Sequence, residues 1–233
     1  MPDPAKNPDH TEHYNLIRRT AIFVIATILG LGSMILVSVI GQHKIPGKIL
    51  LGISHVAAAI LLVMLVAIQY RKHGGLKALL GNNNLKELKL FIPMIVASSI
   101  FFNFYEYFIG IQREDFMASF FDDLTIFQGI ISVVLICTAP PISEEIFYRH
   151  FMLRLLPIEK RPYQLIAAVA TALIFAASHQ QYNNASTFIS IMTLGILLAW
   201  ARLRTNGLSV PIVMHATASI TAVLLSELIA RLN

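Results

Sequence analysis

The chain has 233 residues and a formal net charge of +5; 56% of the residues are hydrophobic and only 13% are charged. A mean hydropathy of +0.67 excludes an ordinary soluble globular domain, which could not bury so much apolar surface. The single cysteine, Cys137, excludes an intramolecular disulfide and a cysteine metal site. Lysines and arginines cluster beside apolar segments, so we interpret them as topology signals of an integral membrane protein and not as a nucleic-acid signal.

The first half of the chain contains three apolar segments of the roughly 20 residues that a bilayer-spanning helix needs. After a polar N-terminal tail (1–19), we predict spanning helices at Thr20–Ile40, Ile49–Tyr70 and Leu90–Ile111. The loop before the third helix is basic and includes a short amphipathic helix, Leu76–Leu80, whereas the loop after it is acidic. This contrast favours a cytoplasmic N-terminus.

The third helix carries Glu106 among tyrosines and phenylalanines. Aromatic side chains collect at the headgroup level of a membrane. We therefore expect Glu106 to be interfacial and not catalytic.

The second half is predicted to begin with a helix at Leu124–Ala139 that Pro140 and Pro141 stop. Ser143 is expected to cap a new helix, Ser143–Leu156, with two glutamates in its first turn, where they would meet the positive end of the helix dipole. Further helices are expected at Tyr163–Ser178, Ala185–Ala201 and Leu208–Ala230.

These segments predict an all-α fold: a single membrane-embedded domain (20–233) of about eight helices. Lipid leaves only helices or closed barrels as spanning structures, and the chain has no alternating strand pattern. The basic residues of the later loops do not all follow one inside–outside alternation: Arg154, Lys160, Arg161, Arg202 and Arg204.

Ionisable residues at membrane depth are costly and mark function. The late helices carry Glu144, Glu145 and Arg149, then His179, and finally His215. At a spacing of four, Glu145 can pair with Arg149, and Glu144 can pair with Tyr148. A short turn makes the Ser143–Leu156 and Tyr163–Ser178 helices antiparallel neighbours, so Glu144 and His179 should reach the same end.

A carboxylate and two imidazoles in an apolar cavity can activate water, and peptide hydrolysis is the reaction that most needs this. Glu144 would take the proton, Glu145 would be held by Arg149, and His179 and His215 would bind the water, a metal or the developing oxyanion. Zinc held by Glu144, His179 and His215 is a candidate cofactor, although the spacing is not that of helical H-E-x-x-H enzymes. Taken alone, the ion pair favours a structural role, and an intramembrane histidine is as often a hydrogen bond between helices.

Three segments resemble the motifs of one family. EEIFYR (Glu144–Arg149) resembles its E-E-x-x-x-R motif, FAASH (Phe175–His179) its F-x-x-x-H motif and HATAS (His215–Ser219) its third motif. The family is the CAAX protease and bacteriocin-processing (CPBP, or Abi) family of intramembrane proteases, and the resemblance covers about 124–225. It implies an eight-helix membrane peptidase that cleaves prenylated proteins or bacteriocin and signal peptides, with or without a metal.

By motif position, the resemblance implies five catalytic residues and three supporting ones. The catalytic residues are Glu144, Glu145, Arg149, His179 and His215; the supporting residues are Phe175, Ser219 and Tyr148. The expected partners are a peptide or lipidated protein substrate and membrane lipids, without nucleic acid. The small size favours a multi-pass protein of a bacterial plasma membrane.

Two positions depart from the family pattern. Ser219 stands where the third motif usually ends in Asn or Asp, and His150 stands where glycine often follows the motif arginine; we expect His150 to face the headgroups. Ser219 motivates an alternative, a catalytically weak relative that acts as a membrane scaffold or a bacteriocin self-immunity protein. A transporter is disfavoured because the polar residues are confined to the second half.

Overall fold

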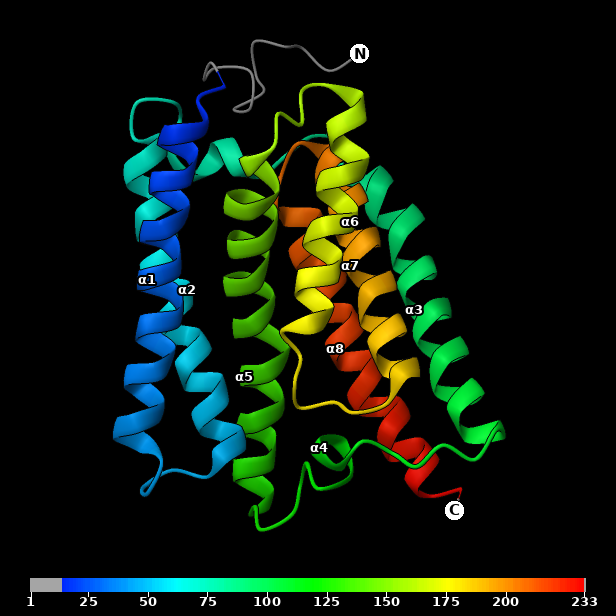
Figure 1. Cartoon of the computed structure of the whole chain (residues 1–233). Coiled ribbons are helices and arrows are strands. Elements are labelled where there is room, and N and C mark those ends of the chain that lie inside the picture. Colours follow the sequence, from blue (N-terminus) through cyan, green and yellow to red (C-terminus); the bar gives the residue numbers. More distant parts are fainter. Residues whose placement is uncertain (1–13, 233) are drawn as a thin grey trace.

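A computed structural model describes residues 14–232, which form a bundle of helices without a β-strand (Figure 1). The long helices are α1 (Leu16–Gly41), α2 (Gly47–Tyr70), α3 (Asn84–Phe108), α5 (Ile126–Glu144), α7 (Ala185–Thr205) and α8 (Ser209–Ala230). The shorter ones are the 3₁₀ helix η2 (Gly75–Leu79), α4 (Asp115–Ala118) and α6 (Arg161–Ala177). Six of the described helices are long and apolar enough to cross a membrane. The predicted all-α membrane fold is thus confirmed.

The first helices follow the prediction closely. α1 begins slightly earlier than expected, at Leu16, because the Asn15 side chain accepts a hydrogen bond from the backbone N–H of Arg18 and so caps the helix. The rest of the predicted tail, 1–13, lies outside the described residues. η2 occupies the loop in which the short amphipathic helix was predicted.

The predicted break at Pro140 and Pro141 is wrong. α5 runs through both prolines to Glu144 and continues without interruption into η3 (Glu145–Met152), a π-helical segment, and η4 (Leu153–Leu155). Neighbouring helices allow membrane helices to keep proline in their interior. Ser143 is therefore no N-cap: its hydroxyl donates to the carbonyl of Pro140 within the same helix.

This continuity changes which end of the bundle the later loops occupy. Ile126–Leu155 is one crossing of 30 residues, where two helices were predicted. As a result, α6 starts and α7 ends at the same end of the bundle as the start of α1 (Figure 1). The later basic residues do share one end with the N-terminal arginines, contrary to the prediction: Arg154, Lys160, Arg161, Arg202 and Arg204.

The bundle has two packed halves joined by α5. α2 packs on α1 and α5, with a core of Ala26, Leu62 and Val66 that extends to Ile146 and Phe151 of η3. On the other side, α3, α7 and α8 share a second core around Phe91, Leu198 and Met214. α6 packs along α7. The two halves meet where η3 touches both, which is where the polar residues lie.

Backbone contacts tie the two halves together at the end where α1 begins. The amide of Asn82 donates to the Thr205 carbonyl (2.8 Å), and the amide of Leu208 donates to the Leu79 carbonyl (2.7 Å). A Cβ on Gly207 would lie only 2.2 Å from the Cα of Gly81. The loop after η2 and the α7–α8 turn can approach this closely only because both positions are glycine.

Candidate active site

Glu145 and Arg149 form an ion pair at the junction of the two halves. Arg149 Nε lies 3.3 Å from Glu145 Oε2, and neither side chain is exposed. Arg149 also donates to the carbonyl of Gly195 in α7, and its guanidinium lies 4.5 Å from the centre of the Phe175 ring in α6. The other Glu145 oxygen accepts a hydrogen bond from His215 Nδ1 in α8 (2.9 Å). The predicted i,i+4 pair thus connects η3 to three other helices.

Glu144, the neighbouring residue, lies between two imidazoles. Its Oε1 is 3.8 Å from Nε2 of His55 in α2, and its Oε2 is 3.8 Å from Nε2 of His215 in α8. Both distances exceed a direct hydrogen bond. Unlike Glu145, Glu144 keeps some exposure, 17% of its side chain. Of the two carboxylates, only Glu144 therefore keeps accessible surface.

Three imidazoles around Glu144 are each anchored through Nδ1. His179 Nδ1 lies 2.7 Å from the Phe175 carbonyl, which can only accept, and His215 Nδ1 donates to Glu145. His55 Nδ1 lies 2.9 Å from the Ser143 hydroxyl, whose own proton goes to the Pro140 carbonyl. These partners assign the proton of each neutral ring to Nδ1 and leave each Nε2 available.

Phe175 is fully buried and contacts several motif residues through its ring. The ring centroids of Tyr148, His179 and His215 lie 5.2, 4.6 and 5.7 Å from that of Phe175. The Tyr148 hydroxyl donates to Ser178 (2.8 Å). Tyr148 therefore fixes the C-terminal end of α6, which carries His179.

The two departures from the family pattern, Ser219 and His150, have hydrogen-bond partners other than Glu144. The Ser219 hydroxyl donates to the backbone carbonyl of His215 (3.2 Å). His150 is 1% exposed, and its Nε2 lies 3.0 Å from Gln69 Oε1 of α2. The prediction that His150 faces the headgroups is wrong, because η3 packs it against α2 and the Tyr70 ring.

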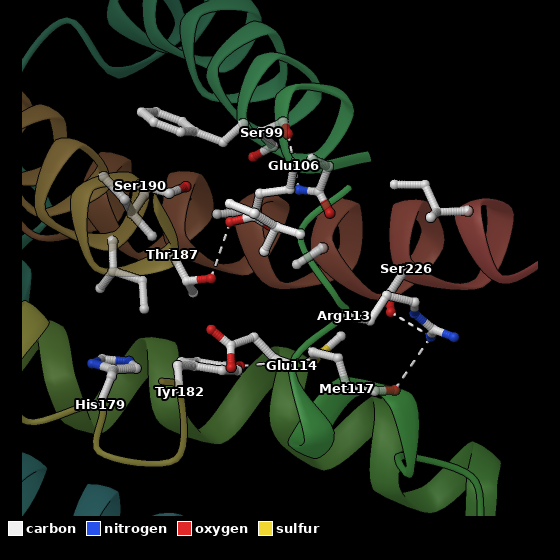
Figure 2. A pocket seen from close by; sticks show the side chains of 18 of the residues that line it. Ser99, Glu106, Arg113, Glu114, Met117, His179, Tyr182, Thr187, Ser190 and Ser226 are labelled. Carbon is white, nitrogen blue, oxygen red and sulfur yellow. Dashed lines mark hydrogen bonds between the residues drawn. The ribbon is translucent and has the colours of Figure 1, made fainter. Parts of the chain in front are cut away.

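A cavity of about 630 Å³ leads to this cluster between α3, α7 and α8 (Figure 2). His179, His215 and Ser219 lie among its lining residues, and at the other end it is lined by Gly110–Asp115 and Ser226. Figure 2 shows His179 at one side of the cavity and Arg113 at the other. The cavity is thus a path from the α3–α4 loop to the imidazoles.

Polar groups along this cavity order its walls. Glu106 accepts hydrogen bonds from Thr187 (Figure 2) and from Ser186. Glu114 accepts from the amides of Asn183 and Asn184. Glu106 therefore holds the start of α7. Tyr182, in the α6–α7 connection, stacks on His179, with ring centroids 6.3 Å apart. Burial raises the pKa of Tyr182 to about 12, so its hydroxyl stays neutral.

The predicted zinc was tested against the arrangement of its ligands. Among residues 14–232, no group of three or more His, Cys, Asp or Glu side chains is placed to hold a metal ion. A zinc ion held by Glu144, His179 and His215 therefore stays a prediction, and the mechanism proposed here uses only groups of the chain.

The structure brings all five predicted catalytic residues into one cluster with Phe175 and Tyr148. It adds one residue that the sequence reasoning missed, His55. A signal was present, because a histidine within an apolar span is itself an intramembrane ionisable residue. It was overlooked because α2 contributes no motif and lies far from the others in sequence.

Comparisons with known proteins agree with the motifs. Residues 126–221 match the family model described as type II CAAX prenyl endopeptidase Rce1-like. A curated relative, an uncharacterized 24.3 kDa protein of Escherichia coli, is 30% identical over 111 residues, 48% of this chain and 51% of that protein. The chain thus spans about half the length of this relative. No solved structure matches the chain. The matched family supports a membrane peptidase of the CAAX type.

A Glu→Gln substitution should destabilise the protein much more in the buried Glu145–Arg149 pair than in the exposed Glu227–Arg113 pair. Glu145→Gln should lower the free energy of unfolding by about 3–5 kcal/mol, because it leaves Arg149 buried without its counter-charge. Glu227→Gln, which removes the exposed partner of Arg113, should cost less than about 1 kcal/mol. Denaturant unfolding in mixed micelles measures both; equal losses would contradict the assigned role of Glu145.

Proposed function

We propose that this chain, which belongs to the CPBP family through residues 126–221, is an intramembrane endopeptidase in which Glu144 activates the hydrolytic water. The observation that carries the proposal is the placement of this carboxylate. Each Glu144 oxygen faces an imidazole Nε2 at 3.8 Å, from His55 on one side and His215 on the other. Oε2 is buried, so we place the water beside Oε1, where it can donate to the carboxylate and to His55 Nε2.

Such a water is oriented before it reacts. One of its protons goes to Glu144, and the other is held by a ring nitrogen, so an oxygen lone pair is left for the scissile carbonyl. The hydrogen bonds at Nδ1 hold the rings of His55 and His215 in the tautomer whose Nε2 can accept a hydrogen bond from the water. Positioning of this kind lowers the entropic cost of the attack.

Residues of this chain can carry out each proton transfer of the hydrolysis. Glu144 takes one proton from the water as the oxygen bonds to the peptide carbon. The tetrahedral oxyanion would be stabilised by the imidazolium form of His179, in which Nε2 donates to the oxyanion while Nδ1 keeps its bond to the Phe175 carbonyl. As the C–N bond breaks, Glu144 returns its proton to the leaving amine. The products are a carboxylic acid and an amine.

The cavity between α3, α7 and α8 is the proposed binding site for the peptide. It ends at His179 and His215 and is lined by both apolar and hydroxyl side chains, as expected for a peptide with an apolar or lipidated segment. The proposed substrates are peptides or lipidated proteins of the CAAX type. The proposed location of this multi-pass protein is a bacterial plasma membrane.

Peptidase assays on the purified protein test this proposal. Glu144→Gln, His179→Ala and His215→Ala should each lower kcat for a prenylated or amphipathic peptide, the glutamate change by about 10²–10⁴-fold. Glu159→Gln, far from the cluster at the other end of the bundle, should retain wild-type turnover. Metal analysis and assay before and after chelation report on the predicted zinc. Equal cleavage by all variants would sink the proposal.

His55 provides a sharper test, because two substitutions keep different halves of its imidazole. His55→Asn keeps a donor for Ser143 but nothing towards Glu144, whereas His55→Gln places a polar group near the position of Nε2. We expect His55→Asn to lower kcat about 10-fold at constant KM, the size of one lost hydrogen bond, and His55→Gln to recover part of it.

A purely structural role for His55 would give a different pattern. Both variants would then lose thermal stability to a similar extent, and their kcat values would not differ from each other. Wild-type kcat in His55→Asn would contradict the bridging water.

One observation favours a second candidate, a catalytically weak scaffold or immunity protein. The Ser219 hydroxyl is engaged by its own helix and offers no donor to the cluster. Ser219→Asn, which extends an amide towards the cavity, should then raise cleavage by about 10-fold or more from a very low wild-type rate. Ser219→Ala is the matched control and should leave that rate unchanged. Efficient cleavage by the wild type would exclude this candidate.

A further inference from the structure

Charge is distributed unequally between the two ends of the bundle. Among the described residues, most basic side chains lie at the end where α1, α3, α6 and α8 begin: Arg18, Arg19, Arg71, Lys72, Lys77, Lys86, Lys89, Arg154, Lys160, Arg161, Arg202 and Arg204. We call this the basic end. The two acids there, Glu87 and Glu159, pair with Arg204 and Arg19.

The opposite end, which we call the acidic end, carries the α3–α4 loop, α4 and the C-terminal end of α8 (Figure 1). Its described acids are Glu106, Glu114, Asp115, Asp122, Asp123 and Glu227, against Lys44, Lys48, Arg113 and Arg231. Lys and Arg in short loops set the orientation of a membrane protein, with the richer side in the cytoplasm. The basic end is therefore the cytoplasmic one.

The cavity opens at the acidic end. Its outer lining includes Gln112 and Asp115, both exposed, from the α3–α4 loop, and its inner end reaches His179 and His215. α6 has only 17 residues, about 25 Å at 1.5 Å per residue. It starts at the basic end and stops short of the acidic end (Figure 1). His179 follows two residues after the last residue of α6, Ala177, and is therefore recessed below the cavity mouth.

We infer that the substrate reaches Glu144 from the extracytoplasmic face of the membrane. Among the substrates proposed above, this selects a peptide or protein segment that is exported or exposed outside the cytoplasm. That a substrate enters this cavity rests on the proposed peptidase function. The orientation of the cavity itself rests only on the charges and the lining residues.

Cysteine labelling tests the orientation without any need for activity. In a Cys137→Ser background, Gln112→Cys marks the cavity mouth and Lys160→Cys, also exposed, marks the basic end. A membrane-impermeant maleimide added to intact expressing cells should label Gln112→Cys, and should label Lys160→Cys only after permeabilisation. The reverse pattern would overturn the inference, as would labelling of both in intact cells.

Sealed vesicles test the route of the substrate. An impermeant peptide added outside should be cleaved by right-side-out vesicles without detergent, and by inside-out vesicles only after detergent. A bulky maleimide on Gln112→Cys should lower turnover several-fold, whereas the same group on Lys160→Cys should not. Cleavage by inside-out vesicles alone would overturn the inference. Absence of cleavage even in detergent would instead count against the proposed function, while the labelling result would stand.

Discussion

The cluster depends on one desolvated ion pair. Placing Arg149 where it has no exposed surface is costly unless its charge and its donors find partners, and these come from different helices: Glu145, the Gly195 carbonyl and the Phe175 ring. Glu145 in turn holds His215. The pair can be satisfied only when α5, α6, α7 and α8 are packed together, so folding of the bundle and assembly of the site are the same event.

The pair also explains how two adjacent glutamates acquire different environments. Both oxygens of Glu145 are engaged by Arg149 and His215, whereas those of Glu144 face ring nitrogens that are too distant for direct bonds. Separate environments for neighbouring carboxylates are how a site assigns one to support and another to proton transfer. The π-helical turn that begins at Glu145 belongs to a kind of irregularity found often at functional sites.

The sequence predicted what depends on local spacing and hydropathy. The spanning segments, the Glu145–Arg149 pair and the three motifs follow from periodicity and from the cost of charge in lipid. The passage of α5 through Pro140 and Pro141 could not be predicted, because packing against α2 overrides the local preference for a break. Because two helices were predicted in place of this single crossing, the later basic loops were predicted at the wrong ends of the bundle. The position of His55 beside Glu144 is a tertiary contact that no motif encodes.

The short α6 has a consequence for the surrounding lipid. A helix of about 25 Å beside helices that match a hydrocarbon core of about 30 Å creates a local hydrophobic mismatch. The bilayer meets such a mismatch by thinning on that side, at a cost that grows with its thickness. Lipid composition thereby acts on the depth at which His179 lies beneath the interface, which makes membrane thickness a physical variable of the site.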